Sequence, residues 1–359
     1  MTDTVLMPLA PLSPRAWVVR HRGSLPFPLE EDGCSLFARA RHGLAAGLQA
    51  VGIGRGDEVL APAYHHGSEI EALQRSGVRC AYYEPGPRLE PDADDLDALI
   101  TGNTRALHLI HHCGFTQDSA RWRRWCDARG LALIEDAAQA WLARVDGRPA
   151  GAFGDLAIFS LYKTFGLPDG GALLCRSGAA RPHGHGDLAA LRLGLEHMAW
   201  IAGRSRAVGA LAARRRARRY DPAADFALGT ARPASRATLF ALPRIVDASA
   251  AERRRANYER LLDRIGDLVR PPFDVLSADA CPFVLPAWVP DKPRFLRRAR
   301  AAGVRPLDLW SVAHPSLPAE RFPRAAALRA SLVGLPIHQE LRRQDIERIA
   351  AVARAAVAP

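Results

Sequence analysis

Between about residue 35 and residue 175, short apolar runs alternate with stretches in which apolar residues recur every three or four positions. Short apolar runs are typical of buried strands, and the longer period predicts the helices that cover them. This alternation predicts an α/β fold with a mostly parallel mixed sheet covered by helices on both faces. Helices are expected at 36–52, 67–77, 93–100 and 119–130, and strands at 56–64, 78–84, 104–112, 131–136, 156–162 and 170–175.

After Arg176 the pattern changes, and a second unit begins near Leu239. One or two helices are expected at 240–266, further helices at 292–303 and 339–357, and strands at 281–289 and 331–338. These elements predict a small α+β domain at the C-terminal end of the chain. We therefore divide the chain into an N-terminal segment (1–34), a large domain (35–235, with an Arg-rich linker or helical region at 176–235) and a small domain (236–359).

Composition agrees with a globular protein. Of 359 residues, 48% are apolar and 24% are charged, which suffices for a buried core. No run reaches the roughly 18 apolar residues of a membrane span, and the first twenty residues do not resemble a secretory signal, so a cytoplasmic location is expected.

The six dispersed cysteines are expected to be reduced thiols. His108, His111 and His112 lack a carboxylate at ligand spacing, so no metal site is expected.

Arginine dominates the positive charge. The formal net charge is +11, and 47 of the 49 basic residues are arginines. Seven of them lie between Arg204 and Arg219, where they indicate either a solvated helix face or linker, or a surface that faces anions. The sequence marks of nucleic-acid-binding folds are absent, so nucleic acid is not expected as a partner.

The two lysines, Lys163 and Lys292, are informative because the chain uses arginine almost everywhere else. An amine can lose its proton and condense with a carbonyl, whereas a guanidinium stays protonated. Lys292 lies between prolines and beside Asp291, a context typical of a surface turn. Lys163 follows an apolar strand and precedes the Gly170-Gly171 pair, a context typical of a site. Asp136, at the end of another strand, is expected at the edge of the sheet where ligands bind.

The chain contains, in this order, the motifs GDEVLAPAY, TRALHLIHHCG, LALIEDAAQA, GAFGDLAIFSLYK, PDGGALL and LPIH. This series of six motifs resembles that of the DegT/DnrJ/StrS family of pyridoxal-phosphate-dependent sugar aminotransferases. The resemblance extends from about Leu36 to Val352. It implies the two-domain fold type I architecture, the cofactor pyridoxal 5'-phosphate, and a homodimer with active sites at the interface.

The resemblance also implies roles for individual residues. Lys163 matches the lysine that forms the internal aldimine, and Asp136 matches the acid that keeps the pyridine nitrogen protonated. Gln139 resembles the residue that approaches the ring oxygen of the cofactor. His66 falls where the family places an aromatic ring against the cofactor, although it also suits the start of a helix at 67–76. Ser160 resembles the serine that bonds the cofactor phosphate.

The sequence departs from the family pattern at the phosphate site, which makes it a divergent member. Only two residues separate Ser160 from Lys163, two fewer than in common members. Where these have an Asn-Gly-Thr turn, this chain has Arg39-Ala40-Arg41, whose amides remain available to a phosphate. Arg41 either adds a charge-assisted bond to the phosphate or is an ordinary exposed residue. His338 in the LPIH motif is expected either to face the substrate or to pack in the core.

The implied reaction is transamination. An amino donor, expected to be glutamate, would release Lys163 from the cofactor, and the freed amine would transfer a proton between donor and cofactor. The nitrogen would then pass to a carbonyl acceptor, with a nucleotide-linked keto sugar as the first candidate. Two alternatives stay open: another pyridoxal-phosphate reaction on a non-sugar substrate, and a cofactor-binding protein without turnover.

Overall fold

The computed structural model describes residues 5–11, 24–178, 182, 225–247 and 249–358. All structural statements below concern these residues. The arginine cluster between Arg204 and Arg219 lies outside them. Within the described part of the chain, no helix has the length and apolar character needed to cross a membrane.

Seven strands form the large sheet, in the order β1-β9-β8-β5-β4-β2-β3. The five from β3 to β8 pair in parallel, while β9 runs antiparallel to both β8 and β1. This confirms the predicted mostly parallel mixed sheet. The strands are β1 (Cys34–Phe37), β2 (Glu58–Pro62), β3 (Arg79–Tyr83), β4 (Thr104–Ile110), β5 (Ala132–Asp136), β8 (Leu156–Ser160) and β9 (Gly171–Cys175).

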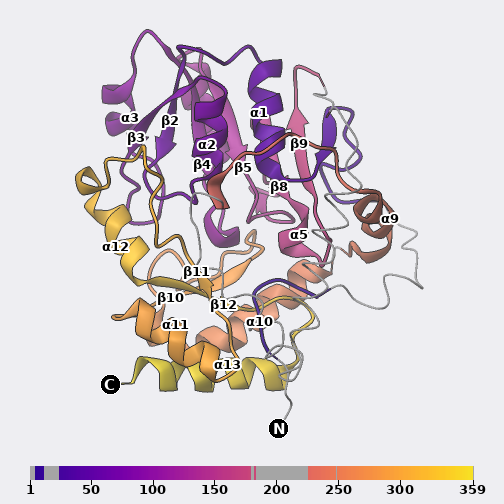
Figure 1. Ribbon diagram of the computed structural model, residues 1–359, viewed down its shortest axis with the longest axis vertical. Coiled ribbons are helices and arrows are strands. Elements are labelled where there is room, and N and C mark those ends of the chain that lie inside the picture. Colours follow the sequence, from indigo (N-terminus) through magenta and orange to yellow (C-terminus); the bar gives the residue numbers. More distant parts are fainter. Residues whose placement is uncertain (1–4, 12–23, 179–181, 183–224, 248, 359) are drawn as a thin grey trace.

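Helices cover both faces of this sheet (Figure 1). Successive strand residues point to opposite faces, so Ile134 packs in the cluster that contains α1 and α2, whereas Leu133 packs with Trp122 of α4 on the other face. The sheet is therefore buried on both sides, which explains its nearly continuous apolar strands. The helices of this part are α1 (Ala40–Ala50), α2 (Ser68–Arg75), α3 (Ala93–Leu99), α4 (Ser119–Asp127) and the single turn α5 (Leu161–Thr164).

The first helix begins later than predicted. Helical periodicity placed its start at Leu36, but Cys34–Phe37 is the edge strand β1, which pairs with β9, and α1 begins at Ala40. The periodic pattern could not show this, because Leu36 and Phe37 satisfy a helical repeat as well as a strand. Pairing with a segment some 135 residues away decides the conformation.

A three-stranded antiparallel sheet, β10-β12-β11, lies beneath the large sheet with its own helices and core (Figure 1). Its strands are β10 (Val284–Trp288), β11 (Leu307–Asp308) and β12 (Leu332–Pro336). Leu6 of the N-terminal segment pairs with Val304 beside this sheet. The helices here are α10 (Ala250–Ile265), α11 (Lys292–Ala301), α12 (Pro323–Ser331) and α13 (Arg343–Val357), whereas α9 (Arg236–Ile245) packs with Trp141 and Phe159 of the large-sheet region. Short elements complete the fold: the hairpin of β6 (Arg144–Val145) and β7 (Arg148–Pro149), and the 3-10 turns η2 (His112–Gly114), η3 (Gly266–Leu268) and η4 (Ala319–Arg321).

Gly171 allows the start of α1 to lie directly on β9. A Cβ atom at Gly171 would come within 2.2 Å of the Ala40 amide nitrogen and 2.3 Å of the Arg39 carbonyl carbon. Both atoms belong to the backbone, which cannot rotate away. The second glycine of the PDGG motif is thus needed for the close approach of β9 to the N-terminus of α1.

We expect Gly171→Ala to lower the free energy of unfolding by about 3 kcal/mol, because the new methyl group must push the start of α1 away from the sheet. Thermal or urea unfolding measures this loss. Gly102→Ala is the matched control, since a Cβ atom there meets nothing within 4 Å. Equal stability of the two variants would show that the α1–β9 contact is not tightly packed.

Candidate active site

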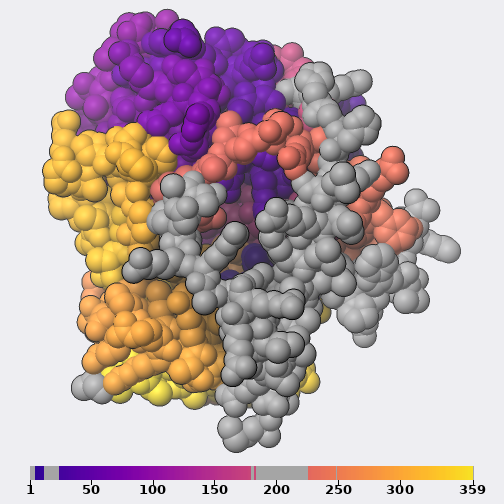
Figure 2. Space-filling view, viewed as in Figure 1, coloured from indigo at the N-terminus to yellow at the C-terminus, as the bar shows by residue number. Residues whose placement is uncertain are grey.

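A cavity of about 660 Å³ lies at the carboxyl edge of the large sheet. Strand ends of the large sheet contribute Ile110, Asp136 and Ser160, while the region of the small sheet contributes Asp308 and Trp310. Figure 2 shows this face hollowed between the indigo and purple part of the chain and the orange part. Residues from 225 onward, in salmon, cross above the hollow. The cavity therefore lies where ligands of parallel sheets bind.

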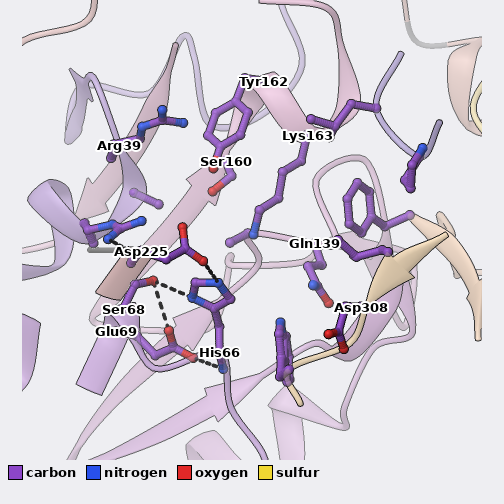
Figure 3. Close-up of a pocket in the computed structure, with 18 of the residues that line it drawn as sticks. Arg39, His66, Ser68, Glu69, Gln139, Ser160, Tyr162, Lys163, Asp225 and Asp308 are labelled. Carbon is purple, nitrogen blue, oxygen red and sulfur yellow. Dashed lines mark hydrogen bonds and ion pairs between the residues drawn. The ribbon is translucent and has the colours of Figure 1, made fainter. Parts of the chain in front are cut away.

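Lys163 extends into this cavity from the one-turn helix α5 (Figure 3). Ser160, the N-cap of the same turn, also lines the cavity. Residues three apart lie on one side of a helical turn, so the short Ser160-to-Lys163 spacing still places both side chains in one cavity. The structure thus brings together the two residues whose spacing departs from the family pattern.

Two buried side chains from distant segments hold the backbone of α5. Arg254 of α10 donates to the carbonyls of Thr164 at 2.8 Å and Lys163 at 3.5 Å, and Gln339 donates to that of Thr164 at 3.0 Å. Burial lowers the pKa of Arg254 to about 10, so the guanidinium still carries its charge at neutral pH. Sequence reasoning missed both residues, because nothing local distinguishes Arg254 from the other 46 arginines.

Asp136 ends β5 and is 7% exposed. Its Oδ1 accepts a hydrogen bond from the Ala138 amide at 2.9 Å, and its Oδ2 lies 3.6 Å from Nε2 of the fully buried His108. His108 thus packs behind the carboxylate of Asp136. The described residues contain no group of three His, Cys, Asp or Glu side chains that could hold a metal ion.

Gln139 and His66 both line the cavity (Figure 3). The Gln139 Oε1 accepts the Cys113 amide at 2.8 Å, which leaves the side-chain NH₂ group for the cavity. His66 donates or accepts through both ring nitrogens: Nδ1 lies 3.1 Å from Ser68 Oγ, and Nε2 lies 3.2 Å from Asp225 Oδ2. These contacts fix the plane of the His66 ring at the cavity wall.

The N-terminus of α1 forms one end of the cavity, with Arg39, Ala40 and Tyr162 around it. The first amides of a helix have no intrahelical partner and favour anions. The Arg39 guanidinium lies 4.7 Å from the centre of the Tyr162 ring. Burial alone would raise the pKa of Tyr162, but the charges of Arg39, Lys163 and Arg41 bring it below its ordinary value. This end of the cavity is therefore electropositive.

Arg41 lines the same cavity, but its side chain has protein partners. Its NH1 group donates to the carbonyls of Asp225, Phe226 and Ala227 at 2.6, 3.1 and 2.9 Å. The interpretation of Arg41 as an ordinary exposed residue is therefore wrong. The interpretation that Arg41 bonds the cofactor phosphate stays a prediction. Arg41 anchors the segment that crosses above the hollow in Figure 2.

The structure agrees with one of the two interpretations of His338, packing in the core, and corrects the interpretation of Lys292. His338 does not line the cavity: it is 2% exposed, its Nδ1 accepts the Glu340 amide, and Asn257 donates to its carbonyl. Lys292 does not lie on the surface, because it is only 2% exposed. It is the first residue of helix α11. Its neighbours in sequence, Asp291 and Pro293, are exposed, and this misled the local interpretation.

Glu135, next to Asp136, organises the loop beneath the site. It is fully buried and accepts five hydrogen bonds: from the Ser119 hydroxyl (2.6 Å), His111 (3.2 Å), and the amides of Gly151 (3.2 Å), Phe153 (2.8 Å) and Gly154 (2.6 Å). Burial alone would raise the pKa of Glu135, but these donors and the charge of His111 hold it below the ordinary value of 4.5.

We expect Glu135→Gln to lower the free energy of unfolding by about 3 kcal/mol at pH 7, because an NH₂ group would face donors that need an acceptor. The stabilisation by the carboxylate is complete above pH 4.5 and is lost as the pH falls through the lower pKa of the folded state. The difference from the wild type should therefore narrow below pH 4.5. Urea unfolding at several pH values measures it, with the exposed Glu259→Gln as control. A difference independent of pH would contradict this role.

The fold is that of solved pyridoxal-phosphate-dependent aminotransferases. The aminotransferase TlmJ from Streptoalloteichus hindustanus matches with a TM-score of 0.69 over 99% of this chain and 98% of its own, at 21% identity. The PLP-form of the putative sugar aminotransferase Spr1654 from Streptococcus pneumoniae matches with a TM-score of 0.68 over 98% and 100%, at 17% identity. These likenesses concern the fold.

Sequence similarity gives the family. Residues 33–183 match the model of the DegT/DnrJ/EryC1/StrS aminotransferase family. The dTDP-3-amino-3,4,6-trideoxy-alpha-D-glucose transaminase of Micromonospora megalomicea subsp. nigra is 37% identical over 131 residues, 35% of either chain. The chain thus matches about a third of the length of such curated relatives. Over the segment 33–183, this protein is therefore similar to the DegT/DnrJ/EryC1/StrS aminotransferase family.

Proposed function

We propose that this protein is a pyridoxal-phosphate-dependent aminotransferase that moves an amino group from an amino acid, glutamate in the first instance, to the carbonyl of a nucleotide-linked keto sugar. One observation carries the proposal: Lys163 and Asp136 line the same cavity as the electropositive N-terminus of α1. An amine, a carboxylate and an anion site in one cavity are the three groups that the cofactor requires.

The residues present fit this cofactor. The N-terminus of α1 and the Ser160 hydroxyl suit its phosphate, and Gly171 removes the side chain that would separate them from the sheet. Asp136 suits the ring nitrogen, and the NH₂ group of Gln139 suits the ring oxygen. His66 presents an aromatic face at the wall. The cavity of about 660 Å³ falls within the size range of cofactor and substrate sites.

The bound cofactor would supply an electron sink for the bond broken at the substrate carbon. The residues of this chain do the rest. Asp136 holds a proton at the ring nitrogen, and the carboxylate of Asp136 is itself held by the Ala138 amide. Lys163 would bind the cofactor covalently and, once displaced, would transfer a proton at the reacting carbon through its Nζ. Arg254 and Gln339 hold the α5 backbone, so that Nζ keeps its place.

A relative supports the proposed substrate class: the matched transaminase of Micromonospora is named for a dTDP-linked amino sugar. Arg300 and Arg305 at the cavity lining suit the phosphates of such an acceptor. We further propose a homodimer with its active sites at the interface, and a cytoplasmic location.

The two half-reactions test the proposal separately. Protein loaded with pyridoxal 5'-phosphate should convert glutamate to one equivalent of 2-oxoglutarate, with loss of the cofactor's visible absorbance. Addition of a dTDP-linked keto sugar should restore that absorbance and yield the amino sugar, with ping-pong kinetics. Failure with glutamate and other amino acids would contradict the transferase, and restoration only by non-sugar carbonyls would contradict the acceptor class.

A further inference from the structure

The segment 307–312 forms one wall of the cavity, and its backbone is strained at one point. Asp308, Trp310, Ser311 and Val312 all line the cavity. Trp310 has φ = 60°, in the left-handed region that a tryptophan rarely adopts. Such a conformation persists only where surrounding contacts hold it, and it is concentrated at binding sites. The segment therefore needs anchors.

Trp310 faces residues of the large-sheet region. Its ring centre lies 4.8 Å from that of Tyr64, 5.8 Å from that of His112 and 6.3 Å from that of His66, with the His66 ring nearly perpendicular. The indole and the imidazole that we place against the cofactor thus border the same part of the cavity. A ligand that reaches the cofactor beside His66 has Trp310 as its neighbour.

Lys292 is the first anchor. Its Nζ donates to the carbonyls of Leu309 at 3.1 Å and Arg329 at 2.8 Å, and it forms an ion pair with Asp308 at 2.7 Å. An ammonium group has three protons, so these three acceptors use all of them. The three acceptors surround one buried point that the compact ammonium group fills. The planar guanidinium of an arginine is larger and does not suit this point. This explains why one of only two lysines in the chain is at this position.

Arg329 is the second anchor, and it joins the two sides of the cavity. Its guanidinium donates to the carbonyls of Trp310 at 2.9 Å and of Val312 at 3.4 Å in the wall segment. The same group donates to the carbonyls of Ala63 at 2.9 Å and His65 at 3.1 Å, directly before His66. Arg329 is 5% exposed. One buried cation therefore sets the position of Trp310 relative to His66.

We propose that Trp310 is a specificity-determining residue whose indole packs against the carbonyl acceptor, and that Lys292 and Arg329 are positioning residues that hold it there. An aromatic wall beside a few placed polar groups is how small-molecule sites orient a ring. The inference rests on the proposed function, because the acceptor is the substrate of that reaction.

A double-mutant cycle of Trp310→Ala and Lys292→Met tests the proposal. Each single variant should raise KM for the dTDP-linked keto sugar about tenfold or more, while the half-reaction with glutamate changes less than about threefold. The double variant should be no worse than Trp310→Ala, because Lys292 acts through Trp310. Trp310→Phe should restore most of the affinity. Arg297→Met, exposed on the same helix α11, is the control and should match the wild type.

Amide hydrogen exchange gives a second readout that needs no substrate. In Lys292→Met, peptides covering 307–312 should exchange at least about tenfold faster than in Arg297→Met. If Lys292→Met does not fold, Asp308→Asn replaces it, since it removes the charge that pairs with Lys292. An unchanged KM in Trp310→Ala, additive effects in the double variant, or unchanged exchange would overturn the inference. A wild type that transfers no amine to any keto sugar would instead contradict the proposed function.

Discussion

Lys163→Ala is expected to lose the covalent attachment of the cofactor and at least about 10³-fold in amine transfer, because the variant lacks both the attachment point and the group that transfers the proton. Borohydride reduction of the loaded wild type, followed by peptide mapping, should label Lys163. The chain contains only one other lysine, Lys292, which is buried and has three acceptors. The peptide map therefore distinguishes Lys163 from Lys292 as the site of cofactor attachment.

Two controls support this experiment. Lys163→Arg retains the positive charge but cannot condense with the cofactor, so it should be as inactive as Lys163→Ala. Arg297→Met should be labelled at Lys163 like the wild type. Label on Lys292, or on neither lysine, would contradict the assignment of Lys163, as would a Lys163→Ala variant that keeps its activity.

Asp136→Asn should still bind the cofactor but lose about 10²-fold in the half-reaction with glutamate. The physical reason is the loss of a charge that stabilises the protonated ring nitrogen, a contact of ~3 kcal/mol in a site with little water. Single-turnover absorbance measurements with glutamate give the rate directly. Asp127→Asn, whose side chain is 62% exposed on α4, is a matched control and should retain the wild-type rate.

Asp136→Glu distinguishes an electronic role from a structural one. Glutamate retains the charge, so this variant should recover part of the rate that Asp136→Asn loses. An Asn variant with the wild-type rate would show that the Asp136 carboxylate serves only to accept the Ala138 amide. A loss of cofactor binding in the Asn variant, without a loss of rate at saturation, would contradict the role we assign.

The sequence by itself determined the class of fold and the resemblance to a family. Alternating apolar strands and periodic helices between residues 35 and 175 were enough for the α/β architecture, because strands buried on both faces must be apolar along their whole length. Motif order predicted the resemblance to the aminotransferase family, which the match of the family model over residues 33–183 confirms. Lys163 and Asp136 could be selected because Asp136 ends a buried strand and Lys163 lies shortly after another, and the carboxyl ends of such strands form the binding edge of a parallel sheet. Their roles, and the domain boundaries after residues 34 and 235, stay predictions.

Only the tertiary structure showed that the buried side chains of Lys292, Arg254 and Arg329 hold the backbone around the cavity. Lys292 was misjudged because its neighbours in sequence are exposed, whereas its acceptors, Leu309, Asp308 and the Arg329 carbonyl, lie 16 to 37 residues away. Arg254 reaches the backbone of Lys163 across 91 residues. Buried cations are stabilised by acceptors that the fold brings around them, and no local pattern records where those acceptors will be.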